Sequence, residues 1–135
     1  MSEMTVQLSL SKVDFRGNTG DKMQFFYAFS QDTCILTKGI NTLKFEFSES
    51  TSDKFKMVDF YLNSDGDKFL EKGAITPSGR NMTINKINAV DKGLIVTSVL
   101  CSYTYRKGQQ KLVEYINCDP QVLNDPDIEV FIQHE

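Results

Sequence analysis

The stretch that decides the fold is GLIVTSVLCSYTYRKGQQKLVEYINC, residues 93–118. Its first half alternates with period two, which is typical of a β-strand because successive side chains point to opposite faces of a sheet. One face would carry Ile95, Val99, Cys101, Tyr103 and Tyr105, and the other Val96, Ser98, Leu100, Ser102 and Thr104. A loop centred on Lys107 and Gly108 would then reverse the chain, so the stretch predicts a β-hairpin.

The register of this hairpin bears on the cysteines. A loop of two or three residues places Cys101 opposite Glu114 or Tyr115, and neither register sets it against Cys118. The chain has three cysteines, an odd number, and no C-x-x-C pair. We therefore expect reduced thiols, with Cys34 and Cys101 as small core residues. Cys118 is expected to be poorly reactive because the neighbouring Asp119 carboxylate raises the pKa of its thiol.

Alternation also marks shorter segments outward from the hairpin. Residues 5–11 and 43–47 predict half-buried strands, and Lys44 and Glu46 of the second should face water. Residues 23–29 are apolar on both faces, which predicts a central strand.

Two further segments complete the strand pattern. Residues 53–62 fit a helix face or a strand, and their aromatic and β-branched content favours the strand. The run IEVFI, residues 128–132, predicts the last strand. No segment is assigned as a helix, and the pattern of about seven to nine strands predicts a single all-β domain over residues 1–135, a sandwich or a barrel.

Composition and charge exclude several classes of protein. The formal charge is −3, from 15 basic and 18 acidic residues, and no block of five like charges occurs. Proteins that bind nucleic acid or anionic membranes usually carry such basic blocks, because phosphate contact relies on Lys and Arg. The sequence therefore predicts no nucleic-acid partner, no membrane partner and, more generally, no phosphate-bearing partner.

The first fifteen residues, MSEMTVQLSLSKVDF, lack the positively charged segment and apolar run of a secretory signal. No apolar run approaches the roughly 18 residues that a membrane-spanning helix requires. We therefore expect a cytoplasmic protein of bacterial type, although export without a leader would leave no trace in such a sequence.

Catalytic and cofactor signatures are sparse. The single histidine, His134, lies one residue from the end, where a triad or a zinc site could not hold it rigidly. Phosphate-loop and dinucleotide fingerprints are lacking. A carboxylate pair could still do acid–base work, but the prediction is a protein without enzymatic activity and without a cofactor.

Two Asp-Pro steps stand out in INCDPQVLNDPDIEV, residues 116–130. Proline lacks an N–H and biases the preceding residue toward extended geometry, and Asp119 and Asp125 are placed to accept backbone N–H bonds in Asx turns. The structural interpretation is a pair of turns that forms a corner before the last strand. The alternative is a divalent-cation site whose oxygen ligands come from the acidic and amide side chains Asp119, Asn124, Asp125 and Asp127.

The segment DPQVLNDP, together with the hairpin before it, resembles the DP-EP family of small bacterial proteins without assigned function. Similar Asp-Pro segments also occur near the end of bacterial inclusion-body proteins of the PixA and AidA type. The second step here is Asp125-Pro126, where the family would have Glu-Pro. The resemblance implies an immunoglobulin-like antiparallel β-sandwich, no known catalysis, and a structural role for the motif residues Asp119, Pro120, Asn124 and Pro126.

These observations favour a protein-interaction or self-assembly module. Strands that are apolar on both faces, such as residues 94–105, leave surplus apolar surface that a second copy or another protein would cover. The alternative is a module that binds a small ligand or a divalent cation through residues 119–127.

Overall fold

A computed structural model describes residues 2–63, 69–87 and 92–126 of the chain, and these residues form ten β-strands and no helix. Accordingly, no helix among them is long and apolar enough to cross a membrane. The strands are β1 (Ser2–Lys12), β2 (Phe25–Phe29), β3 (Thr33–Leu36), β4 (Ile40–Phe47), β5 (Phe55–Leu62), β6 (Leu70–Ile75), β7 (Asn81–Lys86), β8 (Gly93–Lys107), β9 (Gln110–Cys118) and β10 (Gln121–Asn124).

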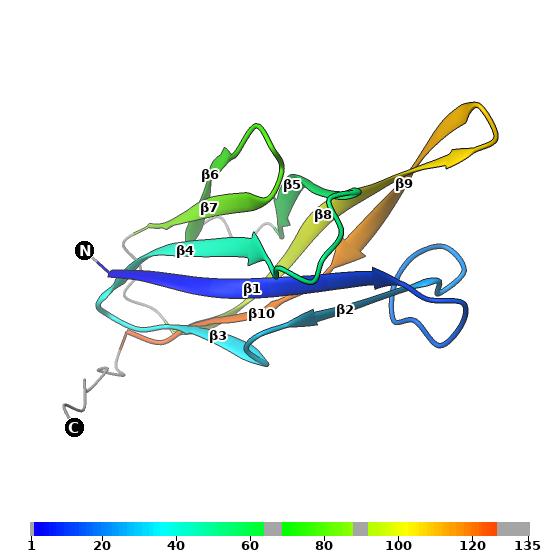
Figure 1. Cartoon of the computed structure of the whole chain (residues 1–135). Helices are drawn as coiled ribbons and strands as arrows, with labels where there is room; N and C mark the ends of the chain where they lie inside the picture. Colours follow the sequence, from blue (N-terminus) through cyan, green and yellow to red (C-terminus); the bar gives the residue numbers. More distant parts are fainter. Residues whose placement is uncertain (1, 64–68, 88–91, 127–135) are drawn as a thin grey trace, which may run out of the picture.

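The strands form two sheets of five, an arrangement consistent with a β-sandwich (Figure 1). The first sheet has the order β2-β1-β4-β7-β6, and the second has the order β3-β10-β8-β5 with β9 also paired to β8. The predicted all-β class is therefore confirmed, while the predicted seven to nine strands are too few.

The expectation of purely antiparallel sheets is wrong. β1 runs parallel to β4, and β3 runs parallel to β10. Both parallel pairs join strands that are not consecutive in the sequence. The chain passes from the first sheet at β2 to the second at β3 and returns to the first at β4. Alternation reports which face of a strand is buried, but it carries no information on the direction of the neighbouring strand.

The hairpin of β8 and β9 is confirmed, with a two-residue turn at Gly108 and Gln109. Gly108 has φ +64°, a conformation that glycine adopts without steric cost. The predicted register is wrong, because Cys101 lies opposite Ile116. The three cysteines are free, as expected, and Cys118 is buried together with Cys34 and Cys101.

The same register continues beyond β9 into β10. Val99 pairs with Cys118 at the end of β9, and Val96 pairs with Gln121 at the start of β10. Only Asp119 and Pro120 interrupt the pairing, since proline has no N–H to donate to the ladder. The predicted corner at Asp119–Pro120 is therefore wrong: the chain stays extended along one edge of β8.

Two other strand predictions meet different outcomes. Residues 53–62 do contain a strand, β5, and a register shift between Met57 and Asp59 makes Val58 the extra residue of a β-bulge. This bulge explains why the apolar pattern fits no single period. The prediction that residues 23–29 are central is wrong, because β2 is an edge strand with Phe26 47 % exposed. The predicted strand at 128–132 lies outside the described residues.

Aromatic side chains join the two sheets in the core. Phe45 of β4 lies 6.1 Å from Phe60 of β5, centroid to centroid, and Phe25 of β2 lies 5.2 Å from Tyr103 of β8. These contacts position β8 over the first sheet and leave the other face of β8 pointing outward.

Candidate functional site

The outward side of the second sheet carries most of the exposed apolar side chains. Of nine exposed large hydrophobic residues in the described part of the chain, six point away from the core on this sheet. We call this surface the outer face; its apolar members are Val58 and Tyr61 of β5, Leu94 and Val96 of β8, and Val113 and Tyr115 of β9.

Strand alternation and pairing place these residues together. Ile95, Thr97 and Val99 of β8 are buried, so Leu94 and Val96 must point outward. Tyr115 pairs with Ser102 across the hairpin and shares that side. The sequence pattern correctly predicted which residues of β8 share each face, and the structure shows that the face with Val99, Cys101 and Tyr103 packs in the core.

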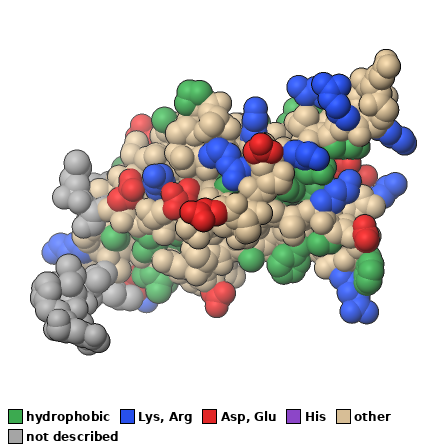
Figure 2. Space-filling model, viewed as in Figure 1, with side chains coloured by type: hydrophobic (Ala, Val, Ile, Leu, Met, Phe, Trp, Pro, Cys, Tyr) green, Lys and Arg blue, Asp and Glu red, His purple; other side chains and the backbone are tan. Residues whose placement is uncertain are grey.

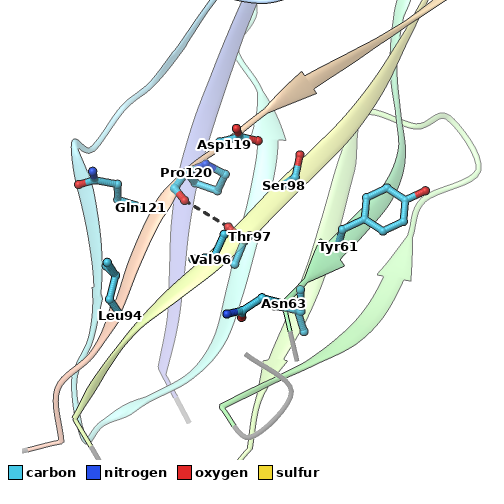
Figure 3. A pocket seen from close by; sticks show the side chains of 10 residues that line it. Tyr61, Asn63, Leu94, Val96, Thr97, Ser98, Asp119, Pro120 and Gln121 are labelled. Carbon is cyan, nitrogen blue, oxygen red and sulfur yellow. Dashed lines mark hydrogen bonds between the residues drawn. The ribbon is translucent and has the colours of Figure 1, made fainter. Parts of the chain in front are cut away.

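A hollow of about 590 Å³ lies at one end of the outer face, between β5, β8 and the junction of β9 with β10 (Figure 3). Leu94 and Val96 supply its apolar lining, and Tyr61 lies on the β5 side. Asp119 and Gln121 lie on the opposite side, so the hollow is apolar in the middle and polar along one border.

Hydrogen bonds fix parts of this polar border. The Thr33 hydroxyl donates to the Gln121 side-chain oxygen at 3.1 Å, and Ser98 donates to the side-chain oxygen of Asn117 at 3.4 Å. Beneath the surface, the Thr97 hydroxyl donates to the Pro120 carbonyl at 3.2 Å (Figure 3). The Asp-Pro step thus ties β8 to the strand at its edge and forms one wall of the hollow.

The structure does not bring the predicted cation ligands together. Asp119 is exposed on the outer face, whereas Asn124 is completely buried on the core side of β10. Asp125, also buried, follows β10, where its N–H donates to the Leu36 carbonyl at 3.0 Å and its carboxylate lies 3.3 Å from Lys92 Nζ. Asp127 lies outside the described residues.

No group of three or more His, Cys, Asp or Glu side chains that could hold a metal occurs in the part of the chain that the structure describes. Pro126, the last described residue, is half-buried just past β10. The motif residues therefore serve different places in the fold: Asp119 and Pro120 at the β9–β10 junction, and Asn124 to Pro126 at the end of β10.

We expect calcium to leave the melting temperature unchanged, because Asp119 and Asn124 lie on opposite sides of the sheet. A specific ligand at a hundredfold excess over its Kd would add about 2.7 kcal/mol to the free energy of unfolding. Thermal melts with and without calcium measure this. A rise that is lost in Asp119→Ala would instead support the cation site.

Cys34 and Cys118 have thiol pKa values above the ordinary range. Burial raises the pKa of Cys34 to about 11. The pKa of Cys118 is raised chiefly by its hydrogen bond with Cys101 and by burial, and the Asp119 carboxylate is the smallest of its causes. Cys118 is thus poorly nucleophilic, as expected, but mainly for a different reason.

No family model matches the sequence, and no curated protein matches it. The resemblance of residues 119–126 to the DP-EP family therefore stays a prediction.

Proposed function

We propose that the chain is a non-enzymatic self-assembly module in which two copies join through their outer faces. The observation that carries the proposal is that, among the described residues, six of nine exposed large hydrophobic side chains lie on that one surface. Contiguous exposed apolar patches on small domains mark interaction sites, because their burial is favourable. An immunoglobulin-like arrangement, implied by the DP-EP resemblance, is part of this proposal.

The chemistry of the outer face suits a protein interface. The outward row of β8 from Leu94 to Thr104 contains no charged residue. Tyrosines stand on both sides of this row, Tyr61 on β5 and Tyr115 on β9. Protein interfaces are depleted of charge at their centre and enriched in tyrosine, which buries a large area and keeps a polar end.

The two outer faces can be related by a twofold axis that passes near Leu100, in the plane between the faces and perpendicular to β8. Such an axis places the Leu94 end of one copy opposite the Tyr115 end of the other, as a symmetric dimer requires. Tyr115 is 64 % exposed at one end, and the hollow beside Val96 and Tyr61 lies at the other. In the proposed dimer each Tyr115 ring occupies the hollow of its partner.

Val96→Glu is expected to weaken dimerisation by about tenfold or more, because it would bury a carboxylate at the interface without a partner. Tyr115→Glu should have the same effect from the other end of the face. Light scattering and analytical ultracentrifugation over a range of concentrations measure the dissociation constant.

Phe26→Glu is the matched control, because Phe26 is also exposed but lies on β2 of the first sheet. It should leave the dimer intact, and thermal melts should show that all three variants are folded. A wild-type protein that is monomeric at high micromolar concentration would overturn the proposal. Equal weakening by Phe26→Glu would show that the outer face is not the interface.

A further inference from the structure

A second hollow lies at the end of the molecule that carries the turn of the β8–β9 hairpin. It has a volume of about 530 Å³, and of the seven described residues that line it four are cationic and none is acidic. We call it the basic pocket; its cations are Lys12, Lys54, Arg106 and Lys111. Figure 2 shows Lys and Arg side chains gathered toward this end of a chain whose net charge is −3.

The fold holds these like charges together despite their repulsion. Arg106 of β8 lies directly opposite Lys111 of β9 in the hairpin ladder, and like charges in that position are destabilising. Among the residues that the structure describes, no carboxylate lies within ion-pair distance of any of the four cations. Glu114, in the same hairpin, accepts a hydrogen bond from Tyr105 and lines a different hollow.

Lys12 is positioned by the aromatic rings beneath it. Its Nζ lies 5.0 Å from the centroid of Tyr105 and 5.4 Å from that of Tyr103, and the two rings stack with centroids 5.6 Å apart. A cation over aromatic faces is attracted to the rings and is restricted in its motion. The ammonium group is thus oriented before any ligand arrives, which reduces the entropy lost on binding.

The pocket also lies at a free strand edge. Thr104 N–H donates to the Lys54 carbonyl at 3.1 Å, just beyond the point where β5 begins to pair with β8. Backbone groups alternate between the two edges of a strand, so the N–H of Arg106, two residues on, points to this same edge. No described strand pairs with β8 at that point on this edge, which leaves a backbone donor beside the cationic side chains.

We propose that the basic pocket binds a small oxyanion with two or more negative charges, a phosphate ester or a polycarboxylate. Such a ligand would neutralise the Arg106–Lys111 repulsion and accept charge-assisted hydrogen bonds, for which the planar Arg fork is well suited. The proposal departs from the expectation of no phosphate partner, which rested on blocks of charge along the sequence. It is independent of the proposed dimer.

Isothermal titration calorimetry at constant ionic strength tests the proposal, with inorganic pyrophosphate and citrate as separate probes. At least one of the two is expected to bind. Binding of pyrophosphate alone assigns a phosphate ester, binding of citrate alone a polycarboxylate, and binding of both the shared oxyanion chemistry. The double variant Arg106→Gln, Lys111→Gln should weaken binding by about tenfold or more, because two charge-assisted hydrogen bonds are lost.

The control Lys38→Gln, Lys44→Gln removes the same charge elsewhere and should leave the affinity unchanged. Thermal melts should show that both double variants fold. Absence of binding by both probes, or equal weakening in the control, would overturn the proposal. Binding of a single-stranded oligonucleotide without binding of either small anion would also overturn it, since the site would then require an extended polyanion.

Discussion

Phe45→Ala is expected to lower the free energy of unfolding by about 3–5 kcal/mol, the usual loss when a fully buried phenylalanine is truncated to alanine. Phe45 is completely buried in β4 of the first sheet. Its ring lies 5.7 Å from that of Phe29 on β2 and 6.1 Å from that of Phe60 on β5, centroid to centroid. Truncation would therefore open a cavity between the two sheets, in addition to losing the transfer free energy of the ring.

Thermal and urea unfolding of the wild type and the variant measure this loss. Domains of this size have a total stability of about 5–15 kcal/mol, so the melting temperature should fall by about 10 °C or more. Phe26→Ala is the matched control: Phe26 lies on the edge strand β2 and is half exposed, so its truncation should lower the free energy of unfolding much less. Similar losses at the two positions would contradict the assignment of Phe45 to the core between the sheets.

Most of the strands were predictable because alternation is a local property, but β6 and β10 were not predicted. β1, β4, β8 and the hairpin turn follow from residues that are neighbours in the sequence. The pairing of β1 with β4 and of β3 with β10 is not local, since it depends on which sheet each intervening strand joins. The period of β5 was obscured by the bulge at Val58, because the extra residue interrupts the alternation of side chains between the two faces of the strand.

At the Asp-Pro steps, the residue types alone could not predict whether the chain turns or stays extended. A proline that cannot donate to a ladder is compatible with a turn and with an interrupted strand, and only the register across β8 distinguishes them. Pairing of Cys118 with Val99 and of Gln121 with Val96 selects the interrupted strand. Asp119 thereby reaches the outer face, which the sequence had not connected with it.

Of the two surfaces proposed to be functional, the outer face was partly predicted from the sequence and the basic pocket was not. Surplus apolar surface on residues 94–105 was predicted, and the outer face includes Leu94 and Val96 from that run. The basic pocket was missed because its cations come from three separate segments of the chain: Lys12, Lys54 and the β8–β9 hairpin. Its only sequence signal is the pairing of Arg106 with Lys111, which follows once a two-residue turn at Gly108 and Gln109 is chosen.

Arg80 is the second position where we expect a large loss, because its guanidinium group holds the β4–β5 connection to the start of β7. Nη1 donates to the Ser52 carbonyl at 2.9 Å and to the Phe55 carbonyl at 3.3 Å, and Nη2 donates to the Thr51 carbonyl at 2.8 Å. The same group lies 4.7 Å from the centroid of the Phe47 ring. These contacts link the first sheet, which contains β4 and β7, to the start of β5 in the second.

Arg80→Ala should therefore lower the free energy of unfolding by about 2–3 kcal/mol, since hydrogen bonds to a charged group contribute about 1.5–3 kcal/mol and carbonyl oxygens would lose their partner. Arg80→Lys should recover only part of this loss, because an ammonium group cannot reproduce the planar fork. Urea unfolding should show a lower midpoint with an unchanged slope. Arg106→Ala is the matched control, an exposed arginine whose truncation should change stability by less than about 0.5 kcal/mol. If Arg80→Ala were no more destabilising than Arg106→Ala, the three carbonyl contacts would not stabilise the fold.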